Sequence, residues 1–472
     1  MTFTAAPVRA DELKRQFTFR STFSLAFAFI SPIIGLYTIF ALALGTAGPA
    51  FWLGFPVVLG GQLLVALVLA ELSSRWPEAG GLYKWTGRLG GERLGWAAGW
   101  AYAWTLIVLV TAQCYAAAPF LLGIFDVTEP SKPTLLLISG LMLVLSTAVN
   151  VLGPRALKVF VALSITAELV GSIVIGTVLL LFFREQPFDA VFHSSGADAG
   201  FLPLLAAMAL IGWSFIGFES AGDIAEEVEQ PRREVPKALV LSLVVVGLIV
   251  MYAAYGLILA IPNMGAVISG DVPDPIHATI VAQLGAGVAK PMFALVVLAF
   301  IAGIAAVQAS VSRVLFAFAR DRELPASAAL GRLSGRDHLP RNAVGASAVA
   351  AAAFLFVALS DDAYATLISM ATVGFYLAFA FPVLAALSAR ARGRWATGEW
   401  NCGRWSLAIN VVAAVWLVFE IVNIAWPRLP DAAWYVNYGA VLMVALVAVA
   451  GVVVRGVMAA GRPRAVLASE QA

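Results

Sequence analysis

Two short stretches of the chain interrupt apolar sequence with residues that can free backbone groups for binding. The first, FAFISPIIGLYTIF, contains Pro32, which has no backbone N–H, and Gly35 three residues later. The second, ALIGWSFIGFES, contains Gly212 and Gly217 and runs into Glu219. If both segments are helices, each is expected to unwind here. Freed amides favour an anionic group and freed carbonyls a cation, so we expect the two breaks to hold a small charged solute.

The solute is expected to contact both breaks. The amides of Ile33, Ile34 and Gly35 can serve an anionic group, and Trp213 and Phe215 can cover the solute as a gate, with cation–π attraction for an amine. Close helix packing is the alternative role of Gly212 and Gly217. The expected binding residues are Ser31, Ile33, Ile34, Gly35, Trp213, Ser214, Phe215, Ile216 and Gly217.

The composition indicates that these segments lie in a lipid bilayer. Of the 472 residues, 61% are hydrophobic and only 12% are charged, and the mean hydropathy is +0.90. Soluble domains carry about 25% charged residues, so the chain is expected to be a membrane protein. Unwound backbone at membrane depth must then be satisfied by protein, water or a ligand, because lipid cannot pair with it.

The apolar runs predict an all-α bundle of about twelve transmembrane helices, each with roughly 20 apolar residues. No connection is long enough for a separate domain outside the bilayer. The expected spans are 22–46, 51–72, 95–122, 133–152, 155–183, 200–222, 238–261, 289–318, 342–360, 363–389, 404–426 and 434–457.

The positions of the basic residues predict the orientation of the bundle. If the N-terminus lies in the cytoplasm, all but four of the 30 Lys and Arg residues fall on the cytoplasmic side. Positively charged loops are retained on the cytoplasmic side. The chain is therefore expected to lie in the cell (inner) membrane with both termini in the cytoplasm. The first twenty residues lack the apolar core of a signal peptide, so the first span is expected to stay attached. The four exceptions are Lys132, Arg184, Lys290 and Arg428.

The two breaks fall five spans apart, at the start of each of two five-helix halves. An odd number of spans per half inverts the second half, and paired broken helices in inverted halves point to a transporter's binding site. The expected organisation is an N-terminal segment (1–21), a first repeat (22–183), a second repeat (200–389), two C-terminal helices (404–457) and a cytoplasmic tail (458–472).

Three acids are expected within or near the bilayer, where ionisable groups are costly and are functional candidates. Glu219 and Asp223 follow the second break, and Glu168 is expected near mid-membrane on the fifth span. Each can take part in proton coupling or gating, and Glu168 can also attract a cationic amine. Structural hydrogen bonding between helices is the alternative for Glu219 and Glu168, and a position on a solvated face is the alternative for Asp223.

Three stretches resemble the amino acid–polyamine–organocation transporter superfamily. They are GWSFIGFESAGDIAEEVEQPRREVPKA (212–238), AELSSRWPEAGGLYKWTGRLGG (70–91) and SRVLFAFARDRELP (312–325). The first is similar to arginine/agmatine-type exchangers, and the other two to amino acid, choline and GABA permeases. The resemblance implies a 5+5 inverted repeat with helices one and six broken, followed by two further helices. The first break departs from the superfamily's Gly-Ser-Gly-like triplet, whose amides hold the substrate carboxylate. Only Gly35 aligns and Pro32 has no amide hydrogen, but the amides of Ile33, Ile34 and Gly35 can still hold an α-carboxylate.

The resemblance also implies roles for charged residues. The position of Glu219 matches that of a glutamate that takes part in gating and proton linkage in the exchangers. Lys158, on the fifth span, matches a lysine that in proton-coupled relatives occupies the position of the sodium ion. Burial would lower the pKa of its ammonium group. The alternative is a lysine whose side chain reaches the membrane surface. A cytoplasmic gate network is expected from Glu226 and Glu227 with basic residues, namely Arg232 and Arg320.

Other classes of function find little support in the sequence. Two cysteines and three scattered histidines form no metal-ligand pattern, and no phosphate-binding Gly-Lys-Ser/Thr loop is present. We expect no enzyme activity, no cofactor and no nucleic-acid partner. The sequence leaves open whether the chain forms a homodimer.

The sequence therefore predicts a secondary active transporter of amino acids or related amines, working by alternating access. Proton-coupled symport is favoured over sodium coupling, because Lys158, Glu168 and Glu219 provide titratable groups at depth. An exchanger for amines, choline, GABA or polyamines, a sodium-coupled permease and a non-transporting sensor are the alternatives.

Overall fold

The computed structural model shows a bundle of long helices, as the apolar runs predict. It describes residues 13–127, 130–195, 200–272, 274–335, 337–356, 363–428 and 433–461. The expected tail 458–472 lies mostly outside these ranges, as do residues 1–12 of the N-terminal segment. Within them, eleven helical segments are long and apolar enough to cross a membrane, and the chain is a multi-pass integral membrane protein. The ninth expected span, 342–360, corresponds to α17 (Arg341–Phe354), and 357–362 lie outside the described residues.

The helices of the first half follow the expected spans closely. α6 is one of the most enclosed helices, with 83% of its most apolar stretch buried. The bounds are α1 (Phe19–Ile30), α2 (Pro32–Tyr37), α3 (Phe40–Ala47), α4 (Gly54–Arg75), α5 (Gly81–Gly90), α6 (Glu92–Gly123), α7 (Lys132–Leu152), α8 (Pro154–Glu168) and α9 (Ile175–Phe182).

In the second half, α15 is similarly enclosed at 78%, whereas only 11% of the C-terminal span is buried. The bounds are α10 (Phe201–Ile211), α11 (Ser220–Asp223), α12 (Pro231–Ala260), α13 (Met264–Ile268), α14 (Pro275–Leu284), α15 (Ala286–Arg320), α16 (Ser327–Leu330), α18 (Ala363–Ala391), α19 (Ser406–Ala425), α20 (Trp434–Asn437) and α21 (Gly439–Gly461).

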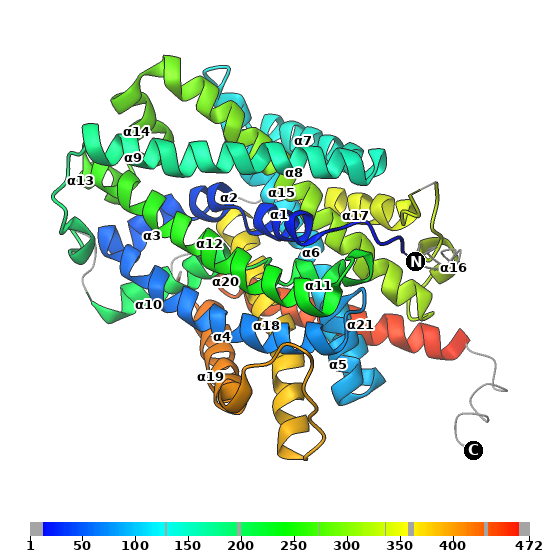
Figure 1. Ribbon diagram of the computed structural model, residues 1–472. Coiled ribbons are helices and arrows are strands. Elements are labelled where there is room, and N and C mark those ends of the chain that lie inside the picture. The colour runs from blue at the N-terminus through cyan, green and yellow to red at the C-terminus, as the bar shows by residue number, and fades with distance from the viewer. Residues whose placement is uncertain are drawn as a thin grey trace, which may run out of the picture.

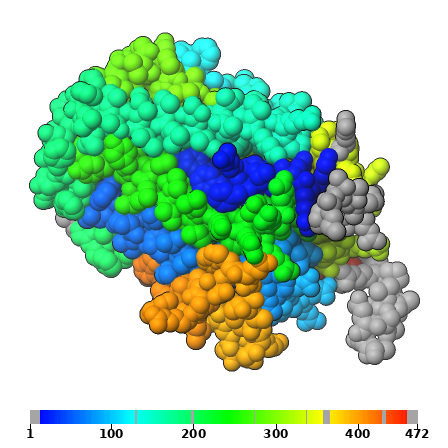
Figure 2. Space-filling model, in the orientation of Figure 1, coloured from blue at the N-terminus to red at the C-terminus, as the bar shows by residue number. Residues whose placement is uncertain are grey.

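The first span lies between elements of both halves. α1 packs against α8, α12 and α15. Figure 2 shows α1 and α2, in blue, flanked by the teal span of α8 and α9 on one side and green α12 on the other. The N-terminal segment and the last turns of α21 lie at one end of the bundle, on the right in Figure 1. We call this the N-terminal end.

The break in the first span follows from the Ser-Pro sequence. A residue before proline is disfavoured in the helical conformation, and Ser31 adopts φ 51° between α1 and α2. Pro32 occupies the first position of α2, where its missing N–H costs nothing. The Ser31 hydroxyl caps α2 by accepting a hydrogen bond from the amide of Ile34, at 3.0 Å.

The break in the sixth span is longer. α10 passes into a 3₁₀ turn from Gly212 to Phe215, and Ile216 is extended, with φ −101° and ψ 155°. Gly217 has φ +105°, and a Cβ atom there would overlap the ring of Phe29 on α1. The chain becomes helical again at α11. Both expected breaks are therefore present.

Replacing Gly217 with alanine is expected to destabilise the protein by at least about 1–3 kcal/mol, the cost of a non-glycine residue in a rare backbone conformation. The overlap with Phe29 adds to this cost. Denaturant titration in detergent micelles measures it. Gly60→Ala is the matched control, because Gly60 is in helix α4 with no atom within 4 Å of an added Cβ. Equal stability of the two variants would contradict the steric argument.

Candidate functional site

The two breaks meet at the centre of the bundle. A Cβ atom on Gly35 would lie 3.2 Å from Cα of Ser214, so glycine is what lets the two backbones approach. The Ser214 hydroxyl donates a hydrogen bond to the carbonyl oxygen of Gly35, at 2.6 Å. The two halves of the chain are thus joined through the very segments that lost helical hydrogen bonds.

The freed backbone groups of the first break are paired with Glu168, which is fully buried. The amide of Ile33 donates to one carboxylate oxygen of Glu168 at 2.8 Å, and the Ser31 hydroxyl donates to the other. The amide of Gly35 donates to the Ser31 carbonyl at 2.8 Å. In this structure the three amides expected to receive a substrate anion are therefore engaged within the chain.

Glu168 directly precedes an irregular stretch of the fifth span. A π-helix from Leu169 to Val174 separates α8 from α9. Single π turns within α-helices are frequent at functional sites. A Cβ atom on Gly171, within the π turn, would collide with Ile33, at 2.8 Å from its Cδ1 atom. The fifth span therefore fits closely against the first break, a feature that the sequence alone does not indicate.

A second acidic group lies at the end of the sixth-span break. The Tyr102 hydroxyl, on α6, is 2.9 Å from Glu219 Oε1 and 2.8 Å from Asp223 Oδ2, and all three residues are buried. The other Glu219 oxygen accepts the amide of Gly217 at 3.0 Å. A hydroxyl has one hydrogen to donate, so both contacts are hydrogen bonds only when one of the two carboxyl groups is itself protonated.

Aromatic rings enclose the sixth-span break. Trp213 and Phe215 are both buried, and Phe215 packs edge-on against Phe55 of α4, with ring centroids 6.0 Å apart. Phe375 of α18 packs edge-on against Tyr102 at 6.0 Å and against Phe29 at 6.5 Å. Rings from both halves thus cover the break, and the role of Trp213 and Phe215 as a gate stays a prediction.

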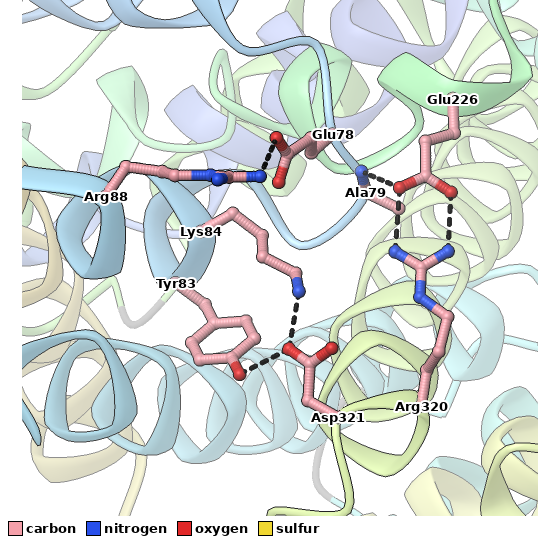
Figure 3. A network of polar contacts seen from close by, with 8 residues as sticks. All are labelled: Glu78, Ala79, Tyr83, Lys84, Arg88, Glu226, Arg320 and Asp321. Atoms are coloured by element: carbon pink, nitrogen blue, oxygen red, sulfur yellow. Dashed lines mark hydrogen bonds and ion pairs between the residues drawn. The ribbon is translucent and has the colours of Figure 1, made fainter. Parts of the chain in front are cut away.

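At the N-terminal end, acids that follow α11 bind arginines of α15. Arg320 donates two hydrogen bonds of 2.8 Å to Glu226, and the amide of Ala79 donates a third at 3.0 Å. Figure 3 shows this pair beside a second one, in which Tyr83 and Lys84 of α5 contact Asp321. Loops and helices from both halves are linked here.

A deeper ion pair joins Glu227 to Arg313. The closest nitrogen–oxygen distance is 2.8 Å, and the two side chains are only 1% and 3% exposed. Arg313 was not among the residues expected in this network, although it lies seven residues before Arg320 and therefore on the same face of α15. Arg232, which was expected in this network, is exposed and forms no ion pair with any residue the structure describes.

The N-terminal segment closes over these pairs. The amides of Gln16 and Phe17 donate to the Glu227 carbonyl at 2.8 and 2.9 Å, and the Phe17 side chain is 1% exposed. Lys158 donates to the Gln16 carbonyl at 2.6 Å. Lys158 therefore contacts the N-terminal segment in this structure, about 15 Å along the helix axis from Glu168. Its role in proton coupling stays a prediction.

The sequence pattern of the amino acid permease family matches residues 21–448. The chain belongs to the amino acid permease family. One relative is the amino-acid permease BAT1 homolog of rice, which is 24% identical over 86% of this chain and 84% of that protein. The branched-chain amino acid permease BcaP of Lactococcus lactis is 28% identical over 70% of this chain and 72% of that protein. The low-affinity putrescine importer PlaP of Escherichia coli is 23% identical over 67% of this chain and 69% of that protein.

This membership confirms the superfamily resemblance and the transporter class that the sequence predicts. Family and relatives are permeases rather than enzymes. The names of the relatives span amino acids and a diamine, so the family alone does not choose a substrate for this permease.

Breaking the Glu227–Arg313 pair is expected to be costly. Glu227→Gln or Arg313→Gln leaves one buried charge without its partner, which costs about 3–5 kcal/mol. The double variant is expected to cost less than the sum of the two. Denaturant titration of all four proteins gives the coupling energy. The exposed pair Arg233–Glu399, 71% and 43% exposed, is the control, with an expected coupling of about 0–1 kcal/mol. Equal coupling in both pairs would contradict the burial argument.

The contribution of Glu226 is expected to depend on pH. Burial opposes its ionisation, but the hydrogen bonds and charge of Arg320 outweigh burial and hold the pKa of Glu226 below its ordinary 4.5. The unfolded chain then binds more protons, so this stabilisation is present above pH 4.5 and is lost as the pH falls through the lowered pKa. The stability difference between wild type and Glu226→Gln should therefore shrink on acidification. A difference that grows instead would reverse the sign of the interaction.

Proposed function

We propose that this permease is a proton-coupled secondary active transporter of amino acids or related amines. The observation that carries the proposal is a buried carboxyl group at each of the two breaks, Glu168 at the first and Glu219 at the sixth-span break. A solute that binds between the breaks would contact backbone groups whose present partners are titratable side chains. Binding and protonation would therefore compete for the same atoms.

Proton coupling is supported by the geometry around Tyr102. Its hydroxyl lies within 3 Å of two carboxyl oxygens, a pairing that is satisfied when Glu219 and Asp223 share at least one proton. Loss of that proton would leave two carboxylates with one donor between them in a buried site, which is unfavourable. The Gly217 amide also binds Glu219, so release of the proton would act directly on the sixth-span break.

Alternating access requires that one end of the bundle open while the other closes. The Glu226–Arg320 pair is 23% and 30% exposed, so its net contribution is small enough to be broken in each cycle. We propose that the N-terminal end, where these pairs lie, is the cytoplasmic side of a cell inner membrane. The distribution of basic residues along the sequence supports this orientation.

Exchange of amines is a second candidate function, and Glu168 favours it. The Ile33 amide and the Ser31 hydroxyl are the groups that an α-carboxylate would be expected to use, and both are bound by Glu168. A substrate without a carboxylate would leave that arrangement intact, and its ammonium group would be attracted by the Glu168 charge.

Transport by purified protein in liposomes tests both candidates. Labelled amino acids, GABA, choline and putrescine are offered under separate inward gradients of protons and of sodium. Proton-coupled symport predicts accumulation that requires the pH gradient and is unaffected by sodium. Exchange predicts uptake only into liposomes preloaded with substrate, and the amine candidate predicts that putrescine or choline is preferred to amino acids.

Glu219→Gln is the informative variant. It is expected to abolish accumulation driven by the pH gradient while preserving exchange of labelled for unlabelled substrate, because glutamine keeps the hydrogen bonds but cannot release a proton. Glu399→Gln, which removes an exposed carboxylate, is the control. Accumulation by Glu219→Gln at the wild-type rate would remove Glu219 from the coupling step.

A further inference from the structure

Two adjoining cavities open along α6 and α18, the first bordered by α21 and the second by α5. The first has a volume of about 330 Å³ and lies between these three helices. Its wall is largely apolar and includes Trp96, Trp100 and Phe381. Two charged residues line it, Arg93 of α6 and Arg455 of α21.

The second cavity lies closer to the N-terminal end and is more polar. It has a volume of about 720 Å³ and shares Leu377 and Phe381 with the first. Its charged lining residues are Arg88, Arg392 and Arg394. Arg88 is neutralised by Glu78 at 2.8 Å, whereas Arg392 and Arg394 form no ion pair with any residue in the described ranges.

The lining of the two cavities is unbalanced in charge. Five arginines and no aspartate or glutamate are among the residues that line them. The apolar cavity borders α21, the least enclosed span, so it lies where membrane lipid has access. An occupant suited to this surface carries negative charge at one end and a long apolar body at the other.

We propose that the cavities together form a binding site for an anionic phospholipid. The phosphate headgroup would lie in the basic cavity, against Arg392 and Arg394, and one acyl chain would fill the apolar cavity that α6, α18 and α21 line. Basic pockets between transmembrane helices bind anionic headgroups because each nearby Lys or Arg attracts the headgroup electrostatically. A zwitterionic lipid would fill the apolar cavity without the same gain from the arginines.

The site also has a structural link to the proton-binding groups. Ala101 and Thr105, which line the apolar cavity, lie on the turns of α6 that carry Tyr102. Gly374 and Leu377 of α18 line it beside Phe375, whose ring packs against Tyr102. A bound acyl chain would therefore contact the outer side of the two helices whose inner sides meet at the buried acids.

Lipid retention by the full chain tests the proposal. The protein is reconstituted in vesicles of phosphatidylcholine, with or without phosphatidylglycerol, re-extracted in mild detergent and analysed by native mass spectrometry. Wild type is expected to retain phosphatidylglycerol in preference to phosphatidylcholine. Arg392→Gln with Arg394→Gln is expected to lower that preference about fivefold for each arginine removed. Arg404→Gln, in the same connection but outside the cavities, is the control.

A second pair of variants tests the acyl-chain cavity independently. Ala448→Phe fills the apolar cavity and is expected to lower retention of both lipids, whereas Val449→Phe, on the 62% exposed neighbouring position, is expected to retain them. Wild-type selectivity in the double arginine variant, or equal loss in the two phenylalanine variants, would overturn the proposal. Displacement of the lipid by inorganic phosphate would instead assign the basic cavity to a free anion and also overturn it.

Discussion

The structure depends on one constraint: backbone polar groups that leave a helix inside a membrane must find partners within the protein. The first break obeys it by drawing on side chains from distant parts of the sequence, and the sixth-span break by drawing on Glu219, two residues from the amide it binds. Glu168 binds the first break, Ser214 joins the first to the sixth, and Glu219 binds the amide of Gly217. The acids in the middle of this bundle are therefore structural partners of unwound backbone, and in the proposed mechanism this pairing is what would let them respond to a proton or a solute.

The proposed coupling role gives a reason for an acid, rather than a neutral polar side chain, at position 168. A serine or asparagine at position 168 would satisfy the Ile33 amide without placing a charge in the bilayer, so the choice of glutamate carries a cost that a purely structural role does not require.

At the N-terminal end the two ion pairs differ in exposure. Glu227–Arg313 is almost fully buried and is suited to hold its elements together, whereas Glu226–Arg320 retains contact with solvent and is suited to reversible opening.

The sequence predicts the helical spans and both breaks well, because hydrophobic length, proline and glycine act locally. It also predicts that Glu226 and Arg320 belong to one network, since each lies just beyond the end of an expected span.

The sequence does not predict the partners of the buried acids. Tyr102 lies in an apolar run of α6 with many aromatic residues, and its contact with Glu219 depends on how α6 is rotated. Packing against α15 and α18 determines that rotation. Hydrophobic periodicity cannot predict it, because nearly every position of this helix is apolar.

The pairing of Lys158 shows why depth along a helix is insufficient to assign a role. Lys158 and Glu168 occupy one span, yet Lys158 binds the carbonyl of Gln16 while Glu168 binds the first break. Gln16 lies three residues before the start of α1, and Ser31 directly follows its end, so Lys158 and Glu168 contact the chain at both ends of the same helix. A movement of the fifth span along its axis would then shift both ends of α1 together, which couples the closure at Phe17 to the geometry of the break at Ser31.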